Sequence, residues 1–272
     1  MTSVHRIAQT GFGTGTNALY DRARPSYQRF TLDFILDSLQ KDGPLNIVEL
    51  GSGTGIFTRA LLQHPTWNER IKLLKAVEPS EGMRETFSKT VNDDRISLSE
   101  GYFDATGVED GWADLVVIAQ AFHWCPDYDA ASAEFARILK PTGTVAWIWN
   151  LEDRDAAQWV AQIRDLIEVH EQGTPQFRHM LWRKTFDTES YKKEFQPPQE
   201  KTWTYHLQGT KESAVDRASS KSYIAILPED QKGEVQDEIR RIIDRSEKVW
   251  IDESKGIFEY PYKAWVVVAH KK

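Results

Sequence analysis

The stretch Val48-Glu49-Leu50-Gly51-Ser52-Gly53-Thr54-Gly55 joins an apolar segment to three alternate glycines. Residues 46–50 predict a short buried strand, and residues 54–64 predict a helix that Pro65 ends. Glycine allows a sharp turn and a close approach of the backbone to a ligand, and the helix start behind it offers free N–H groups. Because ligands of open parallel sheets bind at the carboxyl ends of the strands, this stretch predicts a binding loop.

Strands and helices alternate outward from this loop. Further strands are predicted at residues 73–78, 96–99, 113–119 and 144–149, and helices at 28–40, 80–89 and 129–139. Such alternation is typical of a parallel sheet with right-handed crossovers. We therefore predict the α/β class, with a Rossmann-like, doubly wound and mostly parallel sheet of seven strands.

The pattern changes after Asn150, where the prediction is a helical cap over residues 151–200 inserted before the last two strands. Those strands are expected at 202–207 and 263–270, and section 201–272 also holds lid helices over 211–249. An N-terminal arm, irregular to residue 30, and a helix fill residues 1–45, and the binding core fills 46–150. We expect all of these sections to form a single domain over residues 1–272.

The composition narrows the classes of protein. The net charge of -7 argues against a nucleic-acid partner, which needs a basic face. No run approaches the ~20 apolar residues that cross a bilayer, and residues 1–6 lack a signal-peptide core. Cys125 is the sole cysteine, which favours a reducing, cytoplasmic location, and no histidine or cysteine spacing predicts a metal site. The ten tryptophans either fill a core or form walls around an organic ligand.

The glycine pattern separates two kinds of nucleotide-type site. A dinucleotide fingerprint would need a third glycine where the chain has Ile56. The pattern present is E-x-G-x-G-x-G, which resembles the first motif of class I S-adenosylmethionine-dependent methyltransferases. The resemblance implies that S-adenosylmethionine is the cofactor and S-adenosylhomocysteine the product. It places the cofactor against Glu49, Gly51, Ser52, Gly53 and Gly55. The glycines at 11, 13 and 15 follow no strand, so we interpret them as part of the arm.

Other strand ends extend the predicted cofactor site. Glu78, followed by Pro79, ends the second strand, where a carboxylate accepts hydrogen bonds from ribose hydroxyls, although a helix cap is the alternative role. By resemblance to the family, Met83 lines the adenine pocket. The family often has an acid directly after Gly101, whereas this chain has Tyr102 and Phe103 before Asp104. The fourth strand ends in Ala119, Gln120 and Ala121, beside the expected place of methyl transfer.

One branch of the family, which includes trans-aconitate methyltransferases and related fungal small-molecule methyltransferases, is similar to this chain beyond the first motif. The similar segments are residues 119–124, 20–27, 217–223 and 260–262. The likeness predicts cofactor contacts from Tyr20 and Arg24. The predicted acceptor-binding residues are Tyr27, Phe122, His123, Trp124 and Trp149.

Several roles stay open at this point. His123 is either a general base or a wall of the pocket, and Arg24 either binds a carboxylate or fixes the arm. Trp147 and Trp149 share one face of a strand, so they either stack on a planar ligand or pack under a helix. A gating role of arm and cap is also plausible from their positions.

The predicted function is methylation of a small molecule, at oxygen of a carboxylic acid or hydroxyl group. Acceptors methylated at nitrogen, sulfur or carbon are alternatives, and so is a non-catalytic cofactor-binding regulator. A nicotinamide-dependent oxidoreductase is opposed by Ile56. We expect no nucleic acid, membrane or metal partner, and a monomer or homodimer.

Overall fold

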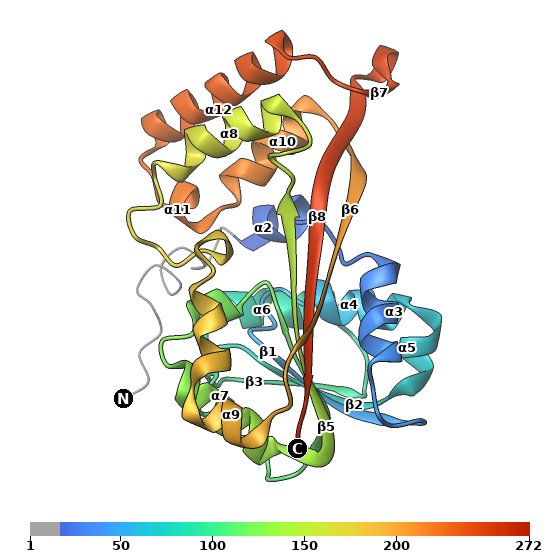
Figure 1. Cartoon of the computed structure of the whole chain (residues 1–272). Helices are drawn as coiled ribbons and strands as arrows, with labels where there is room; N and C mark the ends of the chain where they lie inside the picture. Colours follow the sequence, from blue (N-terminus) through green and yellow to red (C-terminus); the bar gives the residue numbers. More distant parts are fainter. Residues whose placement is uncertain (1–16) are drawn as a thin grey trace.

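One sheet runs through the part of the chain that this computed structural model describes, residues 17–272 (Figure 1). Its strands lie in the order β3-β2-β1-β4-β5-β8-β6, and β7 pairs with β8. The strands are β1 (Leu45–Leu50), β2 (Ile71–Val77), β3 (Ile96–Ser99), β4 (Ala113–Ala119), β5 (Leu139–Glu152), β6 (Gln199–Gly209), β7 (Trp250–Asp252) and β8 (Ile257–His270). From β3 to β5 neighbouring strands run parallel, whereas β8 is antiparallel to β5 and β6. The predicted α/β class and doubly wound, mostly parallel seven-stranded sheet are confirmed, and the three-residue β7 adds an eighth strand.

Helices cover both faces of this sheet, and a separate core lies under each cover. Helices α3 to α6 pack on one face, and α7 packs on the other with α9 and three 3-10 helices. All seven residues of β4 are buried, as the apolar run from Leu115 to Ile118 within it predicts. The helices are α2 (Asn17–Ala23), α3 (Arg29–Asp37), α4 (Ile56–Gln63), α5 (Pro65–Arg70), α6 (Glu81–Thr90), α7 (Tyr128–Ile138), α8 (Gln158–Glu168), α9 (Glu189–Glu194), α10 (Lys211–Ser219), α11 (Ser222–Ala225) and α12 (Glu229–Arg245), with 3-10 helices η1 (Phe122–Trp124), η2 (Phe177–His179), η3 (Leu181–Asp187) and η4 (Glu253–Lys255).

Helices α8, α10, α11 and α12 form a layer of their own, called the cap here, above the carboxyl ends of the parallel strands (Figure 1). The strands β5 and β8 have 14 residues each, and together with β6 they extend beyond the parallel strands β1 to β4 to reach it (Figure 1). A third core, with Trp159, Tyr223 and Ile239, holds the cap together. The segment predicted as a cap at 151–200 is therefore divided, because α8 joins this layer while η3 and α9 pack against α7.

One expectation about local structure needs correction. The arm to residue 30 is not wholly irregular, since α2 occupies Asn17–Ala23. The segment 211–249, where lid helices were predicted, forms α10, α11 and α12, with breaks at residues 220–221 and 226–228. The glycines at 11, 13 and 15 lie outside the described residues. None of the helices within residues 17–272 is both long and apolar enough to cross a membrane.

Candidate active site

The loop between β1 and α4 contains three glycines with left-handed backbone, φ +70° at Gly51, +56° at Gly53 and +86° at Gly55. Their surroundings differ. A Cβ atom on Gly51 would lie 2.6 Å from Ala121 Cβ, and one on Gly55 would lie 2.6 Å from Val91 Cγ2. At Gly53, apart from its neighbours in the chain, no atom of the described residues lies within 4 Å of where a Cβ atom would stand. Gly53 thus borders the open side of the loop, where a ligand can approach the backbone.

Glu78, directly after β2, lies against this loop. One carboxylate oxygen accepts a hydrogen bond from the Gly53 N–H at 2.9 Å, and the other accepts one from the Ser80 N–H at 2.9 Å. Burial raises the pKa of this carboxyl above its usual range. Ser80 also caps α6, on which Met83 is buried. The parallel pairing of β1 and β2 therefore brings the glycine loop and the strand-end acid together.

Two further polar groups of the loop are buried. Glu49 Oε2 accepts a hydrogen bond of 2.5 Å from Thr58 Oγ1, while Glu49 Oε1 and Ser52 Oγ have no partner among the described residues. Burial raises the pKa of Glu49 to about 8, so its carboxyl is mostly protonated at neutral pH. Buried polar atoms without partners are rare and point to a ligand or water.

The turn after β3 and the end of β4 lie beside the same loop. Tyr102 pairs with Ala105 across a tight turn that contains Asp104, and the Phe103 ring lies near Gly51. Ala119 ends β4, and Ala121 lies under Gly51. Gln120 between them has φ +57°, an uncommon conformation for a residue other than glycine. Its side-chain Nε2 donates to the carbonyl oxygen of Asn150 at 2.5 Å, which fixes the end of β4 to β5.

Helix α2 connects the loop with the cap. Asp21 accepts hydrogen bonds of 2.6 Å from both Thr54 Oγ1 and Arg59 Nη2. On the cap side, Arg22 pairs with Asp216 at 3.1 Å, and Arg24 donates to the carbonyl oxygen of Ser220 at 2.9 Å. The Arg24 guanidinium also lies 4.6 Å above the ring of Tyr20.

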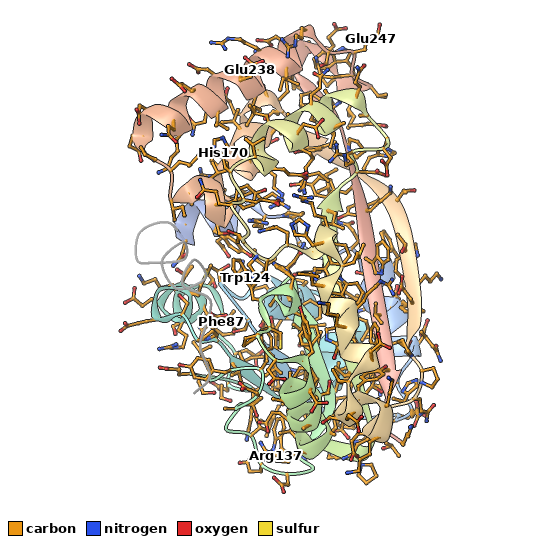
Figure 2. All side chains as sticks on the ribbon, turned by 60° about the vertical axis from the view of Figure 1, so that its left-hand side comes forward. Phe87, Trp124, Arg137, His170, Glu238 and Glu247 are labelled. Atoms are coloured by element: carbon orange, nitrogen blue, oxygen red, sulfur yellow. The ribbon has the colours of Figure 1, made fainter. Side chains whose placement is uncertain are left out.

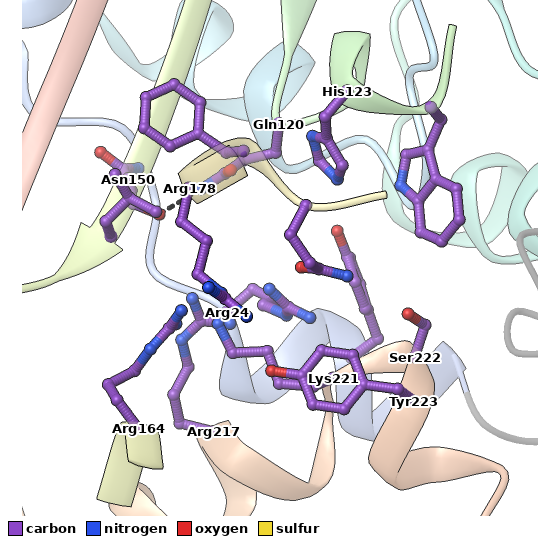
Figure 3. A pocket seen from close by; sticks show the side chains of 15 residues that line it. Arg24, Gln120, His123, Asn150, Arg164, Arg178, Arg217, Lys221, Ser222 and Tyr223 are labelled. Atoms are coloured by element: carbon purple, nitrogen blue, oxygen red, sulfur yellow. Dashed lines mark hydrogen bonds between the residues drawn. The ribbon is translucent and has the colours of Figure 1, made fainter. Parts of the chain in front are cut away.

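A pocket, called the cap pocket here, lies between the ends of β4 and β5, helix α2 and the cap (Figure 3). The cavity has a volume of about 60 Å³. Its cationic side chains, called the cationic cluster, point toward one another from separate elements (Figure 3). The cationic cluster consists of Arg24, Arg164, Arg178, Arg217 and Lys221. The other lining residues are Tyr20, Gln120, His123, Trp124, Asn150, Leu151, Gln176, Phe177, Ser222 and Tyr223.

Several polar atoms that line the cap pocket are buried without a hydrogen-bond partner among the described residues. Five lining atoms are buried and have no hydrogen-bond partner among residues 17–272: Arg24 Nε, Arg217 Nη1, His123 Nδ1, Tyr223 Oη and Asn150 Oδ1. Burial lowers the pKa of Arg24 to about 10, so its guanidinium remains charged at neutral pH. The two arginine nitrogens can only donate hydrogen bonds, and the Tyr223 hydroxyl readily donates one. These three groups suit a ligand that is rich in hydrogen-bond acceptors.

Comparison with known proteins identifies the family. The model of the family described as "Methyltransferase domain" matches residues 48–147. An uncharacterized methyltransferase-like protein of Schizosaccharomyces pombe is 30% identical over 230 residues, which are 83% of this chain and 84% of that protein. The chain belongs to the class I S-adenosylmethionine-dependent methyltransferases.

One further relative and one solved structure are similar to this methyltransferase. A malonyl-[acyl-carrier protein] O-methyltransferase of Methylococcus capsulatus is 32% identical over 105 residues, 38% of this chain and 37% of that protein. The structure of the YcgJ protein from Bacillus subtilis matches with a TM-score of 0.54 and 16% identity, covering 90% of this chain and 99% of that one. The second match shows a shared fold.

Three of the residues predicted to bind the acceptor of this methyltransferase do not line the cap pocket. Phe122 and Trp149 are fully buried and do not line the cap pocket. The Phe122 ring packs among Phe103, Phe135 and Trp147, and Trp149 packs on Phe177 and Trp182. Both belong to the core because the strand ends turn these side chains under α7 and η3. Tyr27 also lies outside the lining, with its ring against Phe57.

His123 and Trp124 do line the cap pocket. Both belong to η1, the 3-10 helix after β4, and the position of His123 is seen in Figure 3. Burial and the positive charges of Arg24 and Lys221 lower the pKa of His123 to about 3. The imidazole of this methyltransferase is therefore neutral at pH 7 and a weak proton acceptor.

Sequence analysis missed most of the cationic cluster in this methyltransferase. Arg164 and Arg178 belong to no motif, and Arg217 and Lys221 lie in the segment 217–223, which was noted only for its resemblance to a branch of the family. What these residues share is that they face the same strand end, and this can be seen only once the position of the cap in the fold is known. Within residues 17–272, no three His, Cys, Asp or Glu side chains are grouped as metal ligands.

Proposed function

We propose that this methyltransferase transfers the methyl group of S-adenosylmethionine to a carboxylate oxygen of a small organic acid and releases S-adenosylhomocysteine. The observation that carries the proposal is the cationic cluster beside the end of β4. An anionic acceptor would balance these charges, whereas an amine acceptor, protonated at neutral pH, would be repelled.

The glycine loop and its neighbours fit the cofactor. The empty side of Gly53, the unpartnered Ser52 Oγ and the adjacent carboxylate of Glu78 leave room and hydrogen-bonding groups for a polar ligand. When bound, S-adenosylmethionine supplies an activated methyl group. The residues proposed to hold it are Tyr20, Arg24, Glu49, Gly51, Ser52, Gly53, Gly55, Glu78, Pro79, Met83, Tyr102, Phe103, Asp104, Ala119, Gln120 and Ala121.

The charges of the cap pocket favour a reaction that needs no general base. A carboxylic acid is already ionised at neutral pH, so the protein only has to hold and orient it. Arginine forks suit that task because they donate two parallel hydrogen bonds to a carboxylate. Burial, together with its cationic neighbours, lowers the pKa of His123 and holds it neutral, so we propose that it hydrogen-bonds the acceptor instead of removing a proton.

Two likenesses support an acid as acceptor. The Methylococcus capsulatus relative is named an O-methyltransferase of malonyl-[acyl-carrier protein]. The branch that residues 20–27 and 217–223 resemble includes methyltransferases of a small organic acid. The cavity of about 60 Å³ suits a small acceptor group. A cytoplasmic location, one domain and a monomer or homodimer remain predictions.

The test is a methylation assay with methyl-labelled S-adenosylmethionine. A panel of small acids is compared with amides, alcohols and amines of the same carbon skeletons. We expect base-labile methyl esters from acids alone. Methylation of the amines or alcohols without any acid product would contradict the proposal.

Arg178→Gln provides the matched variant, since Arg178 lines the cap pocket and is partly exposed. Loss of one charged hydrogen bond to the acceptor should lower kcat/KM about 10–100-fold. Arg154→Gln is the control, because Arg154 pairs with the same Glu168 but lies outside the lining. Equal effects of the two substitutions would show that the loss comes from the ion-pair network instead of the acceptor.

A further inference from the structure

The two outer strands of the sheet differ in length and in protection. At one edge lies β3 with four residues, and at the other lies β6 with eleven. Proteins commonly protect an outer strand by keeping it short, by a proline or by a bulge, because its unpaired N–H and C=O groups can bind another strand. Strand β6 contains no proline, and its pairing with β8 runs from Gln199 to Gly209 without a register shift. The edge of β6 has none of these three protections.

The hydrogen bonds of β8 show which backbone groups of β6 face this edge. The Glu259 N–H donates to the carbonyl oxygen of Val249 on β7, and the Pro261 carbonyl oxygen accepts from the Asp153 N–H. Odd-numbered residues of β8 therefore face away from β6, and even-numbered ones face toward it. Because the latter pair with odd-numbered residues of β6, the even-numbered residues of β6 direct their backbone groups to the free edge. These residues, called the edge residues here, are Glu200, Thr202, Thr204, His206 and Gln208.

The edge residues are accessible to a partner. All five are exposed, and no backbone hydrogen bond joins them to another element of residues 17–272. The residues between them point to the other face of the sheet, where the half-buried rings of Trp203 and Tyr205 pack against Phe30 of α3. Helix α3 thus covers a face of β6 and leaves its edge open.

We propose that a second copy of this chain pairs with the edge of β6, so that the two β6 strands form an antiparallel ladder around a twofold axis at Thr204. Thr204 is the middle residue of β6, so this register pairs Gln199 with Gly209 of the second copy and uses the whole strand. The register also fits the direction of the backbone, since the edge residues then pair only with edge residues and can exchange hydrogen bonds.

The side chains that meet in this register suit a self-pair. Trp203 lies opposite Tyr205 of the second copy on both sides of the axis, and aromatic pairs across antiparallel strands are favourable. The charged residues Glu200 and Lys201 meet uncharged side chains near the other end of the second strand, so no like charges face each other. This match of the strand with its own reverse favours a second copy over an unrelated peptide strand.

Cysteine cross-linking tests the register. Residues that exchange hydrogen bonds in an antiparallel ladder have Cα atoms about 5.5 Å apart, a distance that a disulfide can span. Thr204→Cys should therefore form a disulfide-linked dimer under mild oxidation. Gln208→Cys, which is also exposed, is the control, because its counterpart in the second copy would lie roughly 27 Å away along the strand. It should stay unlinked, and so should the wild type, whose sole cysteine, Cys125, is buried.

Sedimentation velocity over a range of micromolar concentrations measures the dimer itself. The wild type should sediment as a dimer. Thr204→Pro removes one N–H from each copy at the axis and no hydrogen bond between β6 and β8, so the dissociation constant of the dimer should rise about 30-fold or more. Thr204→Val keeps the N–H and a β-branched side chain, and it should dimerise as the wild type does. Circular dichroism shows whether each variant is folded.

The outcomes separate this interface from others. A wild type that is monomeric at every concentration overturns the proposal and leaves the edge to a strand of another protein. A dimer that persists in folded Thr204→Pro, or that weakens equally in Thr204→Val, also overturns it. If Thr204→Pro does not fold, the cysteine variants decide. Linkage of Thr204→Cys without linkage of Gln208→Cys supports the proposal, and any other result overturns it.

Discussion

The three glycines of the loop look alike in sequence, but the physical reason for glycine differs between these positions. Gly51 and Gly55 leave no room for a Cβ atom, because Ala121 and Val91 lie 2.6 Å from where it would stand. At Gly53 the backbone is also left-handed, but the space beyond it is empty. Substitution at Gly51 or Gly55 therefore tests packing, and substitution at Gly53 tests the ligand.

Gly53→Val should abolish binding of S-adenosylhomocysteine, because the new side chain enters the open face of the loop. The left-handed backbone should cost about 1–2 kcal/mol of stability, which leaves the fold intact. Gly256→Val is the matched control, since Gly256 has φ +67° and open space around it but lies in the turn before β8. Calorimetric titration checks both variants. Normal binding by Gly53→Val, or equal losses in the two variants, would show that Gly53 does not face the cofactor.

At the scale of elements, helix α2 joins the glycine loop to the cap. Its Asp21 holds the glycine loop through Thr54 and Arg59, and its other end reaches the cap through Arg22 and Arg24. The helix was missed in the sequence because its seven residues are too few to show an apolar periodicity. Its helical form depends on tertiary hydrogen bonds, whereas β1, β4 and α6 are readable from local patterns such as the Ser80 cap.

Asp21→Asn should weaken binding of S-adenosylhomocysteine by about 5–30-fold, because two charge-assisted hydrogen bonds to the loop are lost or weakened. Hydrogen exchange in α2 should rise in the same variant. Arg22→Gln is the control, since the Arg22–Asp216 pair is exposed and such pairs contribute little. If Asp21→Asn bound the product as well as Arg22→Gln does, α2 would not hold the loop.

At the scale of the whole molecule, the cap pocket is assembled from residues that are far apart in the chain. The cationic cluster spans positions 24 to 221. Its members lie directly after α2, in α8, in η2, in α10 and directly before α11. The glycine loop and Glu78 were predictable because strand ends of a parallel sheet meet at one edge. The cluster was not, since no spacing links its members, and the directions of Phe122 and Trp149 depend on which helices cover the sheet.

The stability of the whole fold should depend on pH through Glu49. Its pKa is about 8 in the folded protein, raised by burial, against roughly 4.3 for an unfolded glutamate. Between these values the unfolded chain releases a proton that the folded chain keeps, so stability falls as pH rises from 4.3 to 8. Glu49→Gln keeps an acceptor for Thr58 and cannot ionise. The variant should therefore match the wild type near pH 4.5 and exceed it at pH 8 by an amount on the order of 5 kcal/mol. Urea unfolding at several pH values measures the difference, with exposed Glu81→Gln of α6 as the control for removing a charge. A difference that stays constant over this range would mean that Glu49 is ionised in the folded protein, and its unpartnered oxygen would then need another explanation.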